Sequence, residues 1–127
     1  MWNYLFVSVG AAIGGALRYW LSGVVHQLMP SNFPYGTLSV NMIGSFLLGL
    51  FIFYFDENDL LSSQFRLLLT VGFCGGFTTF STFSYETISL IRDSEFVLAV
   101  FNIALNVLFS LAGVVLAYIL SKNILGG

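Results

Sequence analysis

The residues best suited to chemistry lie in one apolar stretch, residues 72–86 (GFCGGFTTFSTFSYE). The adjacent glycines Gly75 and Gly76 precede five hydroxyl residues within the seven positions 78–84, and such a sequence forms a poor continuous helix. A break near residues 75–79 would free backbone carbonyl oxygens. A membrane interior tolerates such groups only where they line a cavity, are buried in protein or bind an ion. Hard oxygen ligands of this kind suit a small cation such as Na⁺; a glycine kink stabilised by Ser and Thr is the alternative.

A second pattern in the same stretch is a repeat of three residues. It holds for phenylalanines and for hydroxyl residues: Phe77, Phe80 and Phe83; Thr78 and Ser81; Thr79 and Thr82. At about 100° per residue, each set forms a stripe along one side of a helix. Aromatic rings have electropositive edges, so rings and hydroxyl donors together could conduct a partly dehydrated anion through several weak sites. Lipid contact or core packing is the alternative for the phenylalanines.

Polar residues at helical spacing also occur in two other apolar stretches. Their members lie four residues apart: Thr37, Asn41 and Ser45 in one stretch, and Asn102, Asn106 and Ser110 in the other. An amide in hydrocarbon needs partners, so both faces should point toward protein or water. Hydrogen bonding between helices and lining of a pore both remain open for these residues.

Two ionisable residues stand inside or near apolar stretches. Arg18 follows 17 uncharged residues, and it could attract anions in a vestibule or extend its charge to the membrane interface. Glu86 lies near the end of its stretch, where it could be interfacial or could bind a cation or a proton.

Composition places these residues in a membrane. The chain has 127 residues, of which 57% are hydrophobic and 8% charged, whereas soluble domains carry about 25% charged residues. Its mean hydropathy is +0.92. Residues 1–17, 19–55, 67–85 and 96–121 carry no charge, and a membrane-spanning helix needs about 20 apolar residues. Soluble enzymes, nucleic-acid binders and disulfide scaffolds are therefore excluded, and the single Cys74 has no partner in this chain.

The apolar stretches predict an all-α integral membrane protein with four transmembrane helices. Pro30 and Pro34 divide the longest uncharged run, because proline lacks an amide donor and disfavours helix in the residue before it. The predicted helices cover about 4–28, 36–55, 60–91 with a break near 75–79, and 96–120. They form a single transmembrane domain over 1–127, with both termini on the same side.

The glycines and the positive charges suggest how these helices associate. Glycines four residues apart at Gly10 and Gly14, and at Gly72 and Gly76, allow close helix contact in lipid. Four helices enclose little interior, which favours an oligomer. Each side of the membrane receives two positive residues: Arg66 and Lys122 on one, Arg18 and Arg92 on the other. Because orientation follows Lys/Arg asymmetry, such a chain could insert both ways and pair antiparallel, unless the balance arises by chance.

Three motifs carry a family resemblance, and the longest of them is highly specific. Residues 72–84 (GFCGGFTTFSTFS) closely resemble the signature of the Fluc fluoride channels, also called the CrcB family. Residues 36–41 (GTLSVN) and 14–19 (GGALRY) resemble the family's motifs in its second and first helices. The resemblance implies an antiparallel, dual-topology homodimer with two fluoride pores. It also implies passive export of cytoplasmic fluoride across the inner (plasma) membrane of a microbe, with fluoride, a second copy of the chain and lipid as the partners.

The same resemblance implies roles for individual residues. Phe80 and Phe83 would line the fluoride path, and Asn41 would hydrogen-bond the ion near them. Four further residues would form or extend a polar track: Ser81, Thr82, Thr37 and Glu86. Ser110 resembles a fourth-helix serine near the pore. Backbone carbonyls of Gly75 and Thr78, from both copies, would hold one central structural Na⁺. Arg18 would correspond to an arginine near the vestibule, and the roles of Asn102 and Asn106 stay open.

Two other functions compete with a channel. A small dual-topology, proton-coupled multidrug exporter needs a carboxylate in mid-membrane, usually in its first helix; here the first helix has none, and Glu86 is the candidate. In a structural subunit of a larger complex, the polar stripes would only join helices. The sequence shows no nucleophile–base pair, metal-ligand cluster or phosphate loop, so we do not expect an enzyme.

Overall fold

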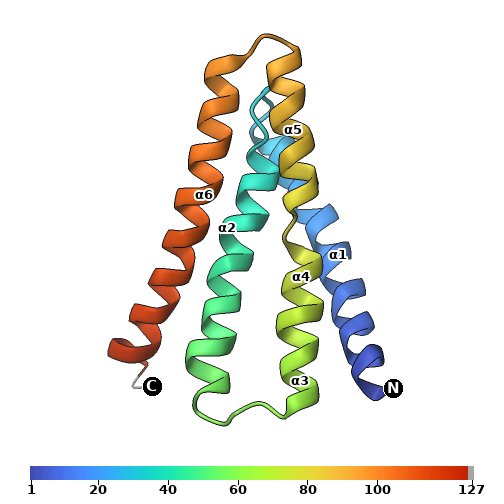
Figure 1. Ribbon diagram of the computed structural model, residues 1–127, viewed down its shortest axis with the longest axis vertical. Helices are drawn as coiled ribbons and strands as arrows, with labels where there is room; N and C mark the ends of the chain where they lie inside the picture. The colour runs from blue at the N-terminus through green and yellow to red at the C-terminus, as the bar shows by residue number, and fades with distance from the viewer. Residues whose placement is uncertain (126–127) are drawn as a thin grey trace.

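The four apolar stretches fold as helices in the computed structural model, which describes residues 1–125 (Figure 1). The first span is α1 (Trp2–Leu28), and the second is α2 (Tyr35–Leu50) continued by the π-helical η1 (Phe51–Asp56). The third span has four parts: α3 (Ser63–Leu67), the π-helical η2 (Leu68–Cys74), α4 (Gly75–Phe77) and, after an interruption, α5 (Phe80–Arg92). The fourth is α6 (Phe96–Ile119) with the π-helical η3 (Leu120–Ile124).

All four spans are long and apolar enough to cross a membrane. Their outward faces carry large apolar side chains, among them Val97, Phe101 and Leu108 on α6. The protein is therefore a multi-pass, all-helical membrane protein, as the sequence predicts. The third span begins at Ser63 rather than near residue 60, because the extended Ser62 caps it and its hydroxyl accepts a hydrogen bond from the Phe65 amide at 3.2 Å.

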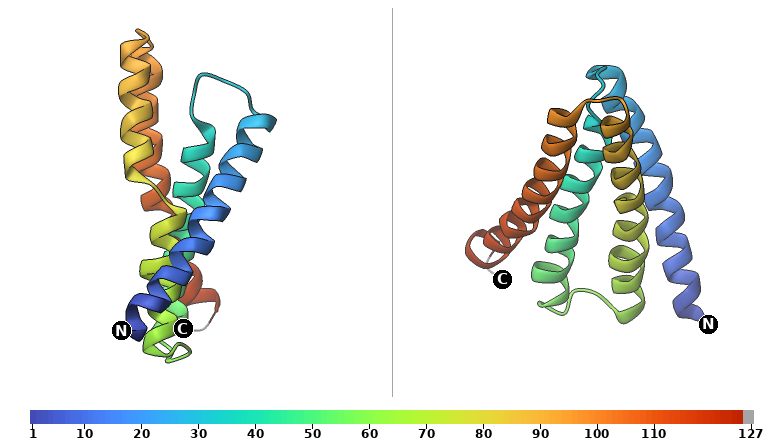
Figure 2. Two further views of the ribbon diagram at one scale, coloured as in Figure 1. Left: turned by 90° about the vertical axis from the view of Figure 1, so that its right-hand side faces the viewer. Right: turned by 45° about the horizontal axis from the view of Figure 1, so that its top comes forward.

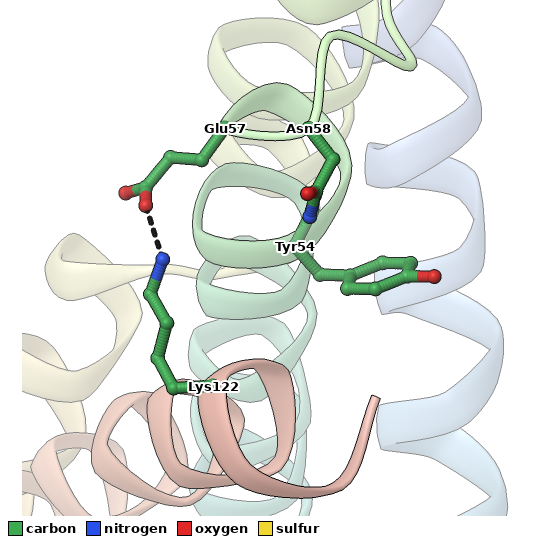
Figure 3. A network of polar contacts seen from close by, with 4 residues as sticks. All are labelled: Tyr54, Glu57, Asn58 and Lys122. Atoms are coloured by element: carbon green, nitrogen blue, oxygen red, sulfur yellow. Dashed lines mark hydrogen bonds and ion pairs between the residues drawn. The ribbon is translucent and has the colours of Figure 1, made fainter. Parts of the chain in front are cut away.

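The start of α1, the link between α2 and α3 and the end of η3 lie at one end of the molecule (Figure 1). Two ion pairs connect the elements there. Lys122 Nζ lies 2.5 Å from Glu57 Oε1 (Figure 3), and Arg66 lies 3.7 Å from Asp56. In the same loop, the Asn58 side chain donates to the Tyr54 carbonyl at 2.6 Å. Such exposed pairs each contribute about 0–1 kcal/mol to the free energy of unfolding. They therefore order the loop but add little to the stability of the fold.

Two packing groups meet at α2. On one side α1 packs along η2 and α4; on the other side α6 packs along α2 and receives α5. The third span thus changes partner at its interruption, since its first part contacts α1 and its second part contacts α6. Figure 2 (left) shows α5 leaning away from α1 above this point.

Small residues bring the backbones of α1 and the first part of the third span together. A methyl group added at Gly72 would lie 2.6 Å from the Val7 carbonyl oxygen and 3.0 Å from the Gly10 Cα. One added at Gly76 would lie 2.7 Å from the Ala11 carbonyl oxygen. The glycine spacing therefore serves close helix packing, which holds the chain leading into the interruption against α1.

We expect Gly72→Ala to lower the free energy of unfolding by about 1–3 kcal/mol, because the helices must separate to admit the methyl group. Thermal unfolding in detergent, followed by tryptophan fluorescence, measures the effect. Gly23→Ala is the matched control: an added methyl there meets nothing within 4 Å, and alanine favours a helix. Equal melting temperatures for the two variants would contradict this account of the packing.

Candidate functional site

The centre of the candidate site is the interruption of the third span at two threonines. Thr78 (φ −91°, ψ 163°) and Thr79 (φ −152°, ψ 121°) are extended. The predicted break near residues 75–79 is therefore present. It does not fall on the glycines, since Gly75 and Gly76 are helical residues of α4. The chain leaves the helix where threonine side chains can replace the backbone hydrogen bonds that are lost.

Side chains satisfy the backbone on both sides of the break. Before it, the amide and the hydroxyl of Thr78 both donate to the Cys74 carbonyl, at 3.0 and 2.8 Å. After it, the Thr79 hydroxyl caps α5 by accepting from the Thr82 amide at 3.1 Å. Arg18 Nε donates to the Gly76 carbonyl at 2.9 Å. The guanidinium thus lies at the carboxyl end of α4, where free carbonyls give a helix its partial negative charge.

Asn41, on α2, holds the middle of the break. Its Oδ1 accepts from the Thr79 amide at 2.8 Å, and its Nδ2 donates to the Thr79 carbonyl at 3.1 Å. One side-chain amide therefore satisfies both backbone groups of the residue that leaves the helix. In hydrocarbon such groups have no water to bond with, so Asn41 is the residue that makes an extended Thr79 tolerable.

A buried hydrogen-bond network extends from Asn41 into α6 and α5. Asn41 Nδ2 also donates to Asn106 Oδ1 at 3.0 Å. Asn106 Nδ2 donates to Asn102 at its carbonyl and its Oδ1, at 2.8 and 2.9 Å, and Asn102 Nδ2 donates to Thr87 Oγ1 at 2.9 Å. The two α6 asparagines, whose roles the sequence left open, therefore bond helices together.

A first cavity of about 500 Å³ opens beside the break, between α2, the third span and α6. Six of the predicted site residues line it: Asn41, Gly75, Thr78, Phe80, Phe83 and Ser110. The structure thus brings together residues far apart in the sequence. The resemblance assigns Asn41, Phe80, Phe83 and Ser110 to a pore and the other two to a Na⁺ site. Thr79 and Asn106 line the same cavity.

The phenylalanines do not form one continuous stripe. The ring centroids of Phe80 and Phe83, on α5, lie 5.4 Å apart; Phe80 is 78% exposed and Phe83 is buried. Phe77 precedes the break, and its buried ring stacks on Phe73 at 5.6 Å. The expected stripe of three is wrong because the extended threonines change the direction of the chain between Phe77 and Phe80.

A second cavity of about 370 Å³ lies between α1, α2 and α5. Four predicted site residues line it, together with Thr79: Arg18, Thr37, Thr82 and Glu86. The Glu86 Oε1 atom is buried and has no hydrogen-bond partner among the described residues. Ser81 lines neither of these two cavities; its exposed hydroxyl lies 3.4 Å from that of Thr79.

The break also changes the environment of two carbonyl oxygens. In an unbroken helix the Thr79 amide would donate to the Gly75 carbonyl and the Thr82 amide to the Thr78 carbonyl. Here the Thr79 amide donates to Asn41 and the Thr82 amide to the Thr79 hydroxyl. Gly75 and Thr78 therefore keep carbonyl oxygens without their helical donors. Residues 1–125 contain no group of three or more His, Cys, Asp or Glu that could hold a metal.

Sequence reasoning did not assign three residues to the site, although it left the role of one of them, Asn106, open. Thr79 joins the two cavities, while Asn106 and Thr87 continue the network beyond Asn41. The signal for Asn106 was its four-residue spacing from Asn102 and Ser110. The signal for Thr79 was its position three residues before Thr82, since a threonine there can cap a helix.

The fold and the site together define a class of protein. Residues 1–125 form four membrane spans, one of them discontinuous, and two cavities lined partly by polar residues meet at the discontinuity. Discontinuous helices of this kind occur at the solute and ion sites of membrane transport proteins. The chain belongs to the CrcB family, because the family described as "CrcB-like protein, Camphor Resistance (CrcB)" matches residues 5–118.

Several similar proteins carry a more specific name. A protein of Geobacter sulfurreducens is 50% identical over 112 residues, covering 88% of this chain and 87% of its own. One of Geotalea daltonii is 46% identical and covers 87% of this chain and 90% of its own. One of Methanosarcina acetivorans is 44% identical and covers 98% of this chain and 94% of its own. The first two are named "Fluoride-specific ion channel FluC" and the third "Fluoride-specific ion channel FluC 1".

We expect Asn41→Leu to destabilise the protein by about 3 kcal/mol, because two backbone groups of Thr79 lose their partner at about 1–3 kcal/mol each. Hydrogen exchange at the Thr79 amide should accelerate, which distinguishes opening of the break from general loosening. Ser45→Ala is the control, since Ser45 lies one turn along the same face and lines the same cavity. Unchanged exchange at Thr79 in Asn41→Leu would show that Asn41 does not hold the break.

Proposed function

We propose that the protein is a fluoride-selective channel that gives passive export of cytoplasmic fluoride. The observation that carries this proposal is the wall of the first cavity, where an amide, two phenylalanine rings and a serine lie together at the break: Asn41, Phe80, Phe83 and Ser110. The names of the similar proteins support the choice of anion.

The chemistry of this wall suits fluoride. Fluoride is small and strongly hydrated, so it must exchange water for hydrogen-bond donors without becoming trapped. Hydroxyl and amide donors and the electropositive edges of Phe80 and Phe83 offer the ion several weak contacts, one after another along the path. A narrow passage between rings would exclude chloride, which is larger.

We propose that the channel is an antiparallel, dual-topology homodimer with two pores. The Phe80 ring is exposed beside a cavity lined partly by polar residues, and a second copy that covers this ring would complete the pore wall. Two positive residues for each side of the membrane give no orientation preference, which supports the antiparallel arrangement. Ser81, exposed on one chain, could then face the pore from the dimer interface.

We also propose a structural Na⁺ at the centre of the dimer. The carbonyl oxygens of Gly75 and Thr78, which lack their helical donors, are hard ligands of the kind that unwound transporter helices offer to Na⁺. Two oxygens from one chain are too few to surround a cation, so a second copy would supply the others. When bound, Na⁺ contributes a fixed positive charge that holds the two breaks together.

Passive export fits the physical chemistry of fluoride in a microbe. Neutral HF crosses the inner (plasma) membrane and dissociates in a near-neutral cytoplasm, where the anion is trapped. A selective pore in that membrane lets the accumulated anion leave down its gradient. The proposal therefore requires no energy source beyond the ion gradient.

Glu86 favours a second candidate function, that of a proton-coupled exporter. A partly buried membrane carboxylate, with one oxygen lacking a partner among the described residues, is what a proton-coupled multidrug exporter requires. Its position on α5, where it lines the second cavity together with Arg18, is equally suited to a polar track. The CrcB family membership and the names of the similar proteins favour the track.

The decisive experiment is fluoride efflux from liposomes that contain only this protein, followed with a fluoride electrode. The channel proposal expects rapid fluoride release without a proton gradient, and retention of chloride. An exporter would release little fluoride and would move a cationic drug only when a proton gradient is imposed. Absence of fluoride release from well-folded protein would overturn the channel proposal.

We expect Phe80→Leu and Phe83→Leu each to reduce fluoride efflux about tenfold or more. Each change removes ring edges while keeping apolar volume, and a loss of about 1.4 kcal/mol of stabilisation is tenfold in rate. Phe101→Leu on the outward face of α6 is the control and should keep the unchanged rate. Unaltered efflux in both α5 variants, with dimer assembly intact, would remove the phenylalanines from the pore.

Replacing Na⁺ by N-methyl-D-glucamine at constant ionic strength should destabilise the dimer. An ion present at a hundredfold excess over its dissociation constant stabilises the bound state by about 2.7 kcal/mol. The loss should appear as a lower melting temperature and as monomer in size-exclusion chromatography. Identical stability in the two cations, after exhaustive exchange, would argue against the Na⁺ site.

A further inference from the structure

The hydrogen bonds that leave Asn41 all run in one direction. Asn41 donates to Asn106, Asn106 to Asn102, Asn102 to the Thr87 hydroxyl, and that hydroxyl to the Phe83 carbonyl at 2.8 Å. Each member accepts from the one before it and donates to the next. Chains of this kind polarise one another and hold their members in one orientation.

The direction of this chain is set by the backbone of the break. The Thr79 amide can only donate and its carbonyl can only accept, so Asn41 must present Oδ1 to the first and Nδ2 to the second. The second Nδ2 hydrogen then meets Asn106, which must present Oδ1. Asn106 Nδ2 is thereby directed toward the carbonyl and Oδ1 of Asn102.

This arrangement uses every donor that Asn41 has. A side-chain amide carries two N–H groups; one is bound to the Thr79 carbonyl and the other to Asn106 Oδ1. An anion that bonds to Asn41 must therefore replace one of these acceptors. The Thr79 carbonyl is a backbone group in a membrane span and would be left unpaired, whereas Asn106 keeps its own donors bound to Asn102.

Asn41 and Asn106 both line the first cavity, so their hydrogen bond is part of its wall. We propose that Asn106 is a positioning residue that competes with the permeating anion for one amide hydrogen of Asn41. The competition limits how tightly the anion is held, which a conducting site requires. The inference rests on the fluoride channel function proposed above.

The test measures the initial efflux rate against fluoride concentration in liposomes. Asn106→Leu removes the competing oxygen at similar volume, so the half-saturating fluoride concentration should fall about fivefold, the equivalent of one hydrogen bond. The maximal rate should fall as well, because the anion leaves more slowly. Asn102→Leu, one turn away on α6 and equally buried, is the matched control and should leave the half-saturating concentration within about twofold of the original.

A purely structural role for Asn106 would lower the maximal rate in both variants and leave half-saturation unchanged. That result, or a higher half-saturating concentration in Asn106→Leu, would overturn this inference and leave the channel proposal standing. Absence of fluoride efflux from the unchanged protein would overturn both.

A second measurement uses the unchanged protein and does not depend on whether the variant folds. With ¹⁵N-labelled asparagine in nanodiscs, saturating fluoride should shift the side-chain amide signals of Asn41 and Asn106. The signal of Asn58, bound to the Tyr54 carbonyl in the loop, should stay in place, and chloride should shift none of the three. No fluoride-induced shift at Asn41 and Asn106 would refute the exchange of partners.

Discussion

A membrane interior offers no water to an unpaired backbone group, and the site of this protein is organised by that constraint. Leaving the helix at Thr78 and Thr79 exposes amides and carbonyls that an apolar wall cannot satisfy. Two other helices supply replacements: Arg18, on α1, bonds the Gly76 carbonyl, and Asn41, on α2, bonds the amide and the carbonyl of Thr79. Asn106, on α6, accepts the remaining amide hydrogen of Asn41. The break is therefore stable only when these helices are packed in their native arrangement.

Much of the fold could be predicted from the sequence because membrane folding follows a few strong rules. Charge-free stretches predicted four spans, and Pro30 and Pro34 predicted the first link. Glycines four residues apart predicted close helix contacts, which the structure places between α1 and the third span. The interruption was also predictable, since glycines and hydroxyl residues together disfavour a helix.

The details of the site were harder to predict because they depend on contacts between distant residues. Periodicity placed Phe77 with Phe80 and Phe83, but two extended residues redirect the chain and separate it from them. Arg18 was expected to face a vestibule, and its bond to the Gly76 carbonyl became visible only in three dimensions. The family motifs grouped Asn41 with Phe80, Phe83 and Ser110, which periodicity could not do, and these four residues line one cavity. The motifs did not separate them from Thr37, Thr82 and Glu86, which line a second cavity.

The side chains that satisfy the break also have an order along the chain. Arg18 and Asn41 precede Thr78, so both are synthesised before the residues whose backbone they bond. Proteins emerge from the ribosome amino-terminus first, and a third span that arrives beside α1 and α2 therefore finds its partners already made. Asn106 follows later with α6 and completes the network. The two helices that bond the backbone of the break, α1 and α2, are thus translated before the span that contains it.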